Sequence, residues 1–270
     1  QQDMLKRLEL SCADHEYLKE VCVRRGIGFV STPFDEQSAD YLVELGVDRL
    51  KIPSGEVTNV PYLKHLGGFG LPIIMSTGMC DLEEVETAVR TLEHAGCWEI
   101  TLLHCLSEYP ADPAEVNLQA MVSMATAFGY PVGYSDHTNH DLAIIGSITY
   151  GARVVEKHIS LDFNVKNAQD WKVSFNKKGL EEMVKTIRKI EEILGLDEIK
   201  VSSNEKKSKI WATKSIFAKR KIYPGEKISL KNVKFQRPGN FLNCSEFNKI
   251  NNRKVSKLIK TNQAIKLNDF

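Results

Sequence analysis

The sequence contains no long apolar segment and no leader-like N-terminus. No hydrophobic run approaches the roughly 20 residues that a helix needs to cross a bilayer. The first residues also lack the basic, apolar and small-residue succession of a secretory signal. These absences predict a protein without a membrane partner, and the expected location is the cytoplasm.

Cysteine is scarce and shows no paired spacing. The six cysteines are scattered without a CxxC motif, so neither a zinc ribbon nor a disulfide framework is predicted. Cys105 lies in a motif-rich stretch, but no cationic residue stands beside it in the sequence to stabilise a thiolate. We therefore expect buried structural thiols rather than a cysteine nucleophile.

The net charge of +1 conceals two modules of opposite charge. Residues 1–195 carry 18 Lys and Arg against 29 Asp and Glu, a balance of −11, whereas residues 196–270 carry 18 against 6, a balance of +12. Such a split predicts two separate domains. We expect a large domain over 1–195, a polar linker over 196–212 and a compact, mostly β domain over 213–270.

The large domain alternates short β-branched runs with helical patterns. Six strands are predicted, at residues 28–32, 49–52, 72–76, 99–104, 131–135 and 153–158. Between them, Asp81 and Glu84 form a capping-box pattern at the start of a helix that ends at Gly96. A last amphipathic helix ends at Gly195. This alternation predicts a parallel sheet covered by helices.

Polar side chains at the ends of these strands favour a barrel over an open sheet. In a (β/α)8 barrel the carboxyl ends of the strands meet at one mouth, where such enzymes keep their active sites. The GxGxxG motif of nucleotide-binding open sheets follows none of the predicted strands. The predicted fold is therefore an α/β (β/α)8 TIM barrel that lacks its first two βα units, which we expect to precede residue 1.

Two histidines and a glutamate indicate a metal site at this mouth. His137 and His158 end consecutive predicted strands, so parallel pairing about 4.8 Å apart would place both imidazoles on one rim, where they could share a divalent metal. Glu156 stands two residues before His158 and should face the barrel interior, where a carboxylate can transfer a proton. An interior salt bridge of Glu156 with Lys51 or Lys157 is the alternative, although alternation predicts that Lys157 faces the helix layer.

A set of hydroxyls and one ammonium group suits a phosphate. A phosphate needs several donors and a positive counter-charge. The candidates at the rim are Thr32, Lys51, Ser54, Ser107 and Ser135.

Taken together, the strand-end motifs resemble those of the N-acetylneuraminate (sialic acid) synthase family. The motifs are Phe29-Val30-Ser31-Thr32-Pro33-Phe34-Asp35, Lys51-Ile52-Pro53-Ser54-Gly55-Glu56, Ser76-Thr77-Gly78-Met79, His104-Cys105-Leu106-Ser107-Glu108-Tyr109-Pro110, Gly133-Tyr134-Ser135-Asp136-His137-Thr138 and Glu156-Lys157-His158. Residues 213–270, with Pro224-Gly225-Glu226 and Arg237-Pro238-Gly239, resemble the antifreeze-like SAF domain that follows the barrel in that family.

The resemblance implies a transferase that condenses phosphoenolpyruvate with an N-acetylated hexosamine, such as N-acetylmannosamine, to give a nonulosonic acid and phosphate. It implies Mn²⁺, or alternatively Mg²⁺ or Co²⁺, on the two histidines, with Glu156 assisting proton movement. The phosphate-suited set would then hold phosphoenolpyruvate. It further implies a domain-swapped homodimer in which the SAF domain adds an arginine to the partner's sugar site. By resemblance the sugar-facing residues are Glu56, Tyr109, Asp170 and Arg237.

Three departures from the family pattern leave alternatives open. The family's first barrel strands, which carry a glutamate and phosphoenolpyruvate-binding lysines, are not in this sequence. Ser107 stands where some members have asparagine, and residues 167–174 replace a Gly-Pro-Asp-His-like loop. The product could therefore be a different surface sugar acid, of the legionaminic or pseudaminic type. From another functional class, the basic C-terminal domain could bind polyanions beside an inactive barrel fragment. Few aromatic residues interleave with its lysines, so we expect no nucleic-acid partner.

Overall fold

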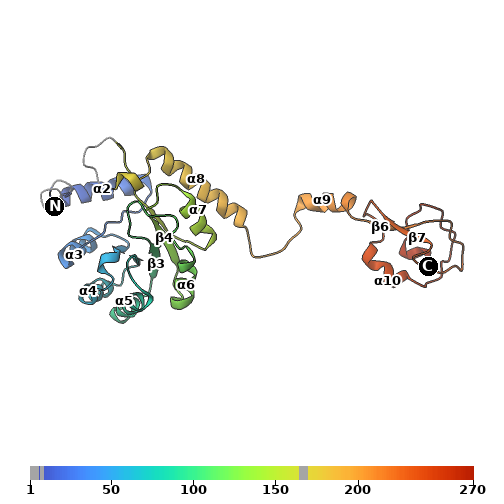
Figure 1. The fold of residues 1–270 in the computed structure, drawn as a ribbon, viewed down its shortest axis with the longest axis horizontal. Helices are drawn as coiled ribbons and strands as arrows, with labels where there is room; N and C mark the ends of the chain where they lie inside the picture. The colour runs from blue at the N-terminus through green and yellow to red at the C-terminus, as the bar shows by residue number, and fades with distance from the viewer. Residues whose placement is uncertain (1–5, 7–8, 164–169) are drawn as a thin grey trace. The chain divides into compact units, whose positions relative to one another are not determined.

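The computed structural model describes residue 6 and residues 9–163 and 170–270, in two compact units that divide between Gly195 and Leu196 (Figure 1). The first unit is built on a five-stranded parallel sheet whose strands follow one another in chain order. The strands are β1 (Leu50–Ile52), β2 (Ile73–Ser76), β3 (Ile100–Cys105), β4 (Val132–Asp136) and β5 (Val155–Lys157).

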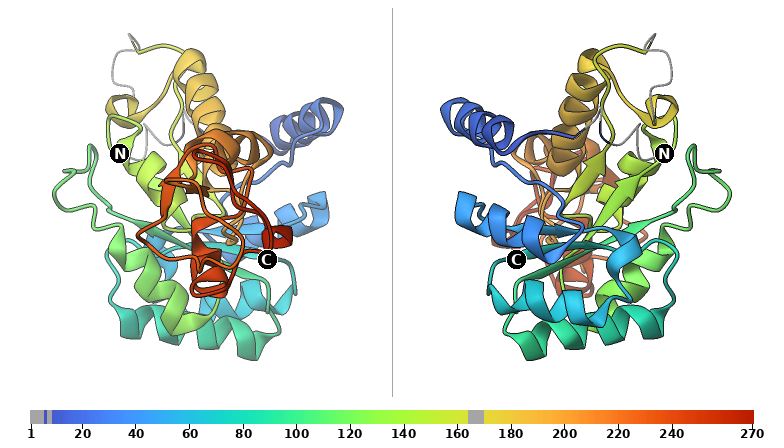
Figure 2. Two further views of the ribbon diagram at one scale, coloured as in Figure 1. Left: turned by 90° about the vertical axis from the view of Figure 1, so that its right-hand side faces the viewer. Right: turned by 90° about the vertical axis from the view of Figure 1, so that its left-hand side faces the viewer.

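The sheet is curled, and helices cover its outer side (Figures 1 and 2). Four steps of about 4.8 Å would place β1 and β5 roughly 19 Å apart in a flat sheet. Instead, Lys51 Nζ on β1 lies 3.5 Å from Glu156 Oε1 on β5. The helices of this unit are α2 (Cys12–Arg25), α3 (Glu36–Leu45), α4 (Val60–Gly68), α5 (Leu82–Ala95), α6 (Gln119–Phe128), α7 (Leu142–Thr149) and α8 (Lys177–Leu194).

One predicted strand does not form, and the count of eight strands is not observed in the described ranges. Residues 28–32 make no ladder with β1, which pairs with β2 alone among the described strands. A run of β-branched residues becomes a strand only where a neighbour satisfies its backbone groups. The predicted α/β fold is thus confirmed as a curled, parallel half-barrel of five strands.

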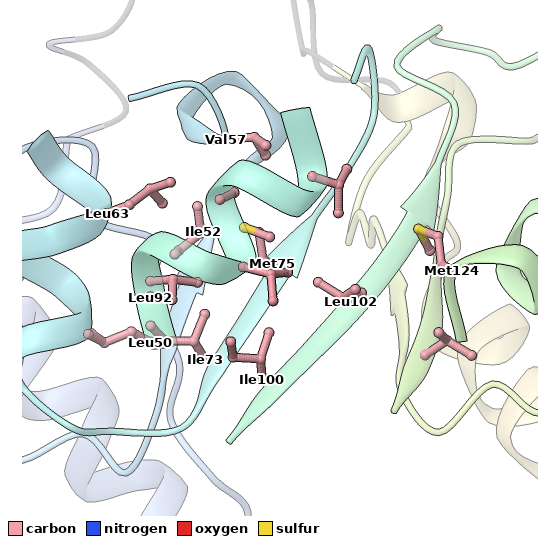
Figure 3. Close-up of a cluster of buried hydrophobic side chains, with 14 of the residues drawn as sticks. Leu50, Ile52, Val57, Leu63, Ile73, Met75, Leu92, Ile100, Leu102 and Met124 are labelled. Atoms are coloured by element: carbon pink, nitrogen blue, oxygen red, sulfur yellow. The ribbon is translucent and has the colours of Figure 1, made fainter. Parts of the chain in front are cut away.

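Alternation along the strands separates an apolar side from a polar one. Parallel register places Leu50, Ile73 and Ile100 opposite one another, and in the same way Ile52, Met75 and Leu102. All six are at most 1% exposed and lie in the hydrophobic cluster of Figure 3 together with helix residues such as Leu63 and Leu92. Full burial of each such side chain contributes about 1.5–3 kcal/mol. The intervening residues, Lys51 and Ser76 among them, therefore face the concave side.

The predicted helix signals are confirmed at both ends of α5. Asp81 accepts a hydrogen bond from the Glu84 backbone N–H at 2.9 Å, and the Glu84 carboxylate accepts one from the Asp81 N–H at 3.0 Å. Gly96 ends the helix with φ of 111°, a conformation that favours glycine. The predicted end of α8 at Gly195 is confirmed as well.

The second unit folds around its own aliphatic core. Strands β6 (Ser215–Ala218) and β7 (Val233–Gln236) pair in antiparallel fashion, and α10 (Phe247–Ile250) is a single turn. Most of the remaining chain forms turns around buried residues such as Ile216, Ile228 and Ile259. The small antiparallel β region matches the expected SAF-like fold.

The expected linker over 196–212 is helical in its second half. Helix α9 (Ser203–Ala212) begins at a capping box formed by Ser202 and Glu205. Its end is held by the turn at Arg237, since Arg237 Nε donates to the Ala212 carbonyl at 2.8 Å and the Gly239 N–H donates to the Ile210 carbonyl. The polar residues that suggested a linker form the exposed surface of this helix. No helix in the described ranges is long and apolar enough to span a membrane.

Helices α4 and α5 pack closely because α4 presents a glycine to α5. A Cβ atom on Gly67 would lie 2.7 Å from the Ala95 Cβ, whereas a Cβ on neighbouring Gly68 would meet nothing within 4 Å. We expect Gly67→Ala to destabilise the first unit by about 1–3 kcal/mol through overpacking. Gly68→Ala should be neutral or stabilise by up to about 1 kcal/mol. Urea midpoints followed by circular dichroism on the full chain measure the difference.

A second substitution provides the control for this comparison. Ala95→Gly in the Gly67→Ala background removes the atom that the new methyl group meets, so part of the lost stability should return. Equal midpoints for the two alanine variants would show that the glycine is not what sets the helix separation.

Candidate functional site

A cavity of about 480 Å³ opens at the carboxyl ends of the strands. It combines nine of the twelve predicted site residues, which come from segments spread over more than 120 positions of sequence. These nine are Thr32, Lys51, Ser54, Ser107, Tyr109, Ser135, His137, Glu156 and His158, and the lining is completed by Phe34, Pro53, Gly55, Ser76, Met79 and Cys105.

A polar network crosses the floor of this cavity. The Lys51 ammonium donates to Ser76 Oγ at 2.7 Å and lies 3.5 Å from Glu156 Oε1. The other carboxylate oxygen of Glu156 accepts from Ser135 Oγ at 2.7 Å and from Ser76 Oγ at 3.5 Å. The predicted alternative for Glu156, an interior salt bridge with Lys51, is therefore present, and it lies inside the cavity.

Lys51 and Glu156 differ in their access to solvent. The Lys51 side chain is 8% exposed and that of Glu156 is 42% exposed. Burial lowers the pKa of Lys51 from its ordinary value, and the negative charge of Glu156 partly opposes this shift. The ammonium is thus held in place by strand-borne acceptors beside a carboxylate that reaches the open cavity.

The two histidines follow neighbouring strands at the same level. The register pairs Ser135 with Glu156 and Asp136 with Lys157, so His137 and His158 come next on each chain. Their ring centroids lie 5.4 Å apart. The predicted placement on one rim is confirmed.

His137 is prepared to act as a ligand or acceptor through Nε2. Its Nδ1–H donates to the Leu106 carbonyl at 2.7 Å, which leaves Nε2 without a proton in the neutral ring. Burial lowers the pKa of His137, with the Leu106 bond acting in the opposite direction. The Tyr109 ring lies 4.1 Å from the His137 ring, centroid to centroid. Burial also raises the pKa of Tyr109 to about 12, so its phenol keeps its proton.

These residues fit a divalent metal as a partial ligand set. Neutral imidazoles are suitable ligands, and a carbonyl that fixes the tautomer through the other ring nitrogen is a usual partner of such ligands. Among the described residues no group of three or more His, Cys, Asp or Glu side chains is placed to hold a metal. Two imidazoles would therefore need oxygen ligands from water or substrate to complete the coordination.

A third part of the cavity is built around Gly78. Its backbone N–H donates to Ser54 Oγ at 2.9 Å. A Cβ atom at this position would lie 2.3 Å from Ser107 Oγ and 2.7 Å from Cys105 Sγ. Only glycine permits the two hydroxyls and the backbone to come so close. Cys105 is 6% exposed, as expected for a buried thiol.

Three predicted sugar-facing residues do not line the cavity. Glu56 accepts a hydrogen bond from Asn59 Nδ2 at 2.7 Å, within a short 3-10 turn and the helix start that follows it. Asp170 lies beside the cavity, with Oδ2 3.8 Å from His158 Nδ1, while residues 167–169 of the expected sugar loop lie outside the described residues. Arg237 belongs to the second unit, where it contacts Ala212.

Sequence reasoning missed Ser76 and the partner of Asp136. Ser76 joins Lys51 to Glu156, and its position at the inward-facing end of β2 was the available signal. Asp136, which precedes His137 in sequence, pairs with Lys157 Nζ at 2.5 Å. Alternation explains this pair, because Asp136 and Lys157 both face the helix layer, as was predicted for Lys157 alone.

Comparison with known proteins agrees with this arrangement. The chain matches the NeuB family over residues 1–199 and the SAF domain over residues 213–270. It is 44% identical over 260 residues to the N,N'-diacetyllegionaminic acid synthase of Legionella pneumophila, covering 95% of this chain and 73% of that protein.

Two solved structures show the same architecture. A putative spore coat polysaccharide biosynthesis protein E from Chromobacterium violaceum has a TM-score of 0.82 at 25% identity, covering 97% of this chain and 79% of that one. The N-acetylneuraminic acid (sialic acid) synthetase of Leptospira borgpetersenii has a TM-score of 0.72 at 31% identity, covering 76% and 72%. The predicted resemblance is therefore confirmed: the chain belongs to the NeuB family, carries a SAF domain, and is a synthase-type enzyme of nonulosonic acid formation.

Proposed function

We propose that this enzyme condenses phosphoenolpyruvate with the open-chain aldehyde of an N-acylated hexosamine, giving a nonulosonic acid and phosphate. The observation that carries the proposal is the convergence of Lys51, Glu156 and the two histidines in one cavity. Within it, a cationic group, a carboxylate and two imidazoles lie within reach of one small substrate.

Phosphoenolpyruvate is assigned to the part of the cavity around Lys51. The ammonium supplies the counter-charge for an anion, and the hydroxyls of Ser54, Ser107, Ser135 and Thr32 supply donors. The Lys51 ammonium already donates a hydrogen bond to Ser76 Oγ at 2.7 Å. The lysine therefore loses little conformational freedom when the substrate binds.

We assign the divalent metal, Mn²⁺ in the first instance, to His137 and His158. When bound, the ion would polarise the aldehyde oxygen and orient water. The chain's own contribution is to present two imidazoles 5.4 Å apart, one with its tautomer fixed by Leu106.

Glu156 is assigned the proton transfers that accompany bond formation. Its carboxylate receives a hydrogen bond from Ser135 and remains partly open to the cavity. In the overall reaction, carbon 3 of the enol attacks the aldehyde carbon, water adds to carbon 2, and phosphate leaves with the bridging oxygen. Glu156 can accept one proton of that water and pass it to the alkoxide formed from the aldehyde oxygen, and the second proton is released as carbon 2 becomes the ketone and phosphate leaves.

Two candidate sugars remain within this proposal. The resemblance suggested N-acetylmannosamine, whereas the similarity to a synthase of N,N'-diacetyllegionaminic acid favours a hexose with two acetamido groups. We infer that Tyr109, together with Glu56 and Asp170, contacts the sugar. We also infer that the five observed strands belong to an eightfold barrel, because the sheet is curled enough for side chains of β1 and β5 to meet across its concave side.

The reaction itself is tested by supplying phosphoenolpyruvate with Mn²⁺ and a panel of hexosamines. We expect phosphate release to require an N-acylated sugar, with the diacetamido sugar used at least about tenfold more efficiently in kcat/KM than N-acetylmannosamine, a difference of about 1.4 kcal/mol. Phosphoenolpyruvate labelled with ¹⁸O at the bridging position should pass the label to phosphate, as mass spectrometry can establish. Label retained in the keto acid would exclude the proposed C–O cleavage, and equal use of both sugars would remove the preference for the legionaminic type.

Lys51 should give phosphoenolpyruvate binding an alkaline limit. A lysine is charged below its pKa and neutral above it, and burial lowers the pKa of Lys51. We therefore expect kcat/KM for phosphoenolpyruvate to fall with rising pH, at a lower pH than an ordinary lysine would give. Because guanidinium stays charged, Lys51→Arg should move this limit upward whatever its effect on the maximal rate. An unmoved alkaline limit would assign it to another group.

Arg237 and the partner subunit form the remaining part of the proposal. We infer a homodimer in which Arg237 of one chain contacts the sugar in the site of the other. Its Nε bonds to Ala212, which leaves the other guanidinium donors for a ligand. The opposite charges of the two sequence regions support association between them.

Mixed dimers test this arrangement. An Arg237→Ala subunit and a His137→Ala subunit should each be nearly inactive alone. Heterodimers of the two should recover up to about half the activity of the unaltered dimer, because one of the two shared sites then holds both intact residues. Verified heterodimers with no recovered activity would contradict the cross-subunit contact.

A further inference from the structure

A buried ion pair lies directly behind the candidate site. Lys157 Nζ is 2.5 Å from Asp136 Oδ2, and the two side chains are 2% and 0% exposed. Both face the helix layer rather than the cavity. Each is adjacent in sequence to the site, since Asp136 precedes His137 and Lys157 stands between Glu156 and His158.

The pair also fixes the chain that follows His137. Lys157 Nζ donates a second hydrogen bond to the Thr138 carbonyl at 2.7 Å. Thr138 in turn donates to Asp136 Oδ1, through its hydroxyl at 2.9 Å and through its backbone N–H at 3.3 Å. The ammonium on β5 therefore binds residues on both sides of His137.

Phe175 extends the same arrangement to His158. The Lys157 ammonium lies 4.5 Å from the centroid of the Phe175 ring. The backbone N–H of Phe175 donates to the His158 carbonyl at 2.9 Å. The segments that carry the two histidines are thus connected through a single cation.

Stability alone does not account for charges at these positions. Other positions on the same side of β4 and β5 hold Val132, Tyr134 and Val155, and the first two are at most 5% exposed. Desolvating two charges is costly, and well-packed hydrophobic residues in place of a buried ion pair are often at least as stabilising. Compared with apolar contacts, ionic hydrogen bonds fix the distance and orientation of the two side chains, whereas apolar side chains can shift relative to one another.

We propose that Asp136 and Lys157 are positioning residues that hold His137 and His158 at the separation and orientation a divalent metal requires. The inference depends on the metal site assigned under the proposed function. Partners that orient metal ligands typically change metal affinity 10–100-fold when removed.

Mn²⁺ affinity of the full chain tests this, measured by titration against the electron paramagnetic resonance signal of free Mn²⁺. The main variant combines Asp136→Leu with Lys157→Met, which removes both charges and leaves no buried ion unpaired. The second, Thr138→Val, keeps the shape of the side chain and removes only the hydroxyl, which lies 2.9 Å from Asp136 Oδ1 and 2.8 Å from the His140 carbonyl. The matched control is Val132→Ala, on the same strand and the same side but at its far end.

We expect the double variant to stay folded and to bind Mn²⁺ about 10–100-fold more weakly, and Thr138→Val to bind at least about threefold more weakly. Val132→Ala should lower the unfolding midpoint without changing Mn²⁺ affinity. If the double variant does not fold, the Mn²⁺ affinity of Thr138→Val alone tests the positioning role.

Two other outcomes are distinguishable. Unchanged Mn²⁺ affinity in the folded variants, with tight binding by the unaltered enzyme, would overturn the positioning role and leave the proposed function intact. An unaltered enzyme that binds no Mn²⁺ would overturn the metal assignment, and the positioning role with it.

Discussion

The arrangement of polar side chains on the concave side of the sheet depends on one buried ammonium group, which must stay charged and in a fixed position. Lys51 is almost fully buried, and an isolated ammonium in such a place would be strongly unfavourable. Ser76 and Glu156 supply its acceptors, and Ser135 holds Glu156 in turn. Because these four residues come from β1, β2, β4 and β5, the network can exist only in a curled sheet, and the curl in turn places every strand end at one mouth.

The same sheet carries a second charge pair, Asp136–Lys157, which strand alternation places on the opposite face from Lys51 and Glu156. The network with Lys51 faces the cavity, where Glu156 is accessible to a substrate. The Asp136–Lys157 pair on the other face is buried, with side chains 0% and 2% exposed, and Lys157 also donates to the Thr138 carbonyl. A substrate can therefore rearrange the first pair by binding to it, while the second keeps the strand ends in place. Under the proposed roles, the pleat separates charged groups one residue apart in sequence into a reacting pair and a supporting pair.

Local geometry explains how much of the site could be predicted from sequence. Within a strand, direction alternates with every residue, so the inward Glu156 and the outward Lys157 followed from alternation, while Lys51 and Ser135 followed from their residue types near predicted strand ends. Alternation gives no direction beyond the end of a strand, and Glu56, assigned to the sugar by resemblance, lies in a 3-10 turn and bonds to Asn59. The ladder expected at 28–32 does not form with the described strands because it depends on a pairing partner that the sequence pattern does not reveal. The helix at 203–212 had a readable signal in the Ser202–Glu205 capping box, which was passed over for the polar composition of the segment. Ser76 was overlooked because a single serine at a strand end more often caps a turn.

The two halves of the cavity are built from different kinds of structure, and this bears on product identity. Residues assigned to phosphoenolpyruvate and the proton lie mostly on or directly after strands, fixed by the ladder. The remaining wall includes Phe34, Met79 and Tyr109, which lie outside the described strands and are 67%, 75% and 47% exposed. Loops on a rigid scaffold can change shape without disturbing it. Under the proposed function, the strand-borne half identifies the reaction class, whereas the choice among acylated sugars rests on loop residues around the mouth, Tyr109 among them.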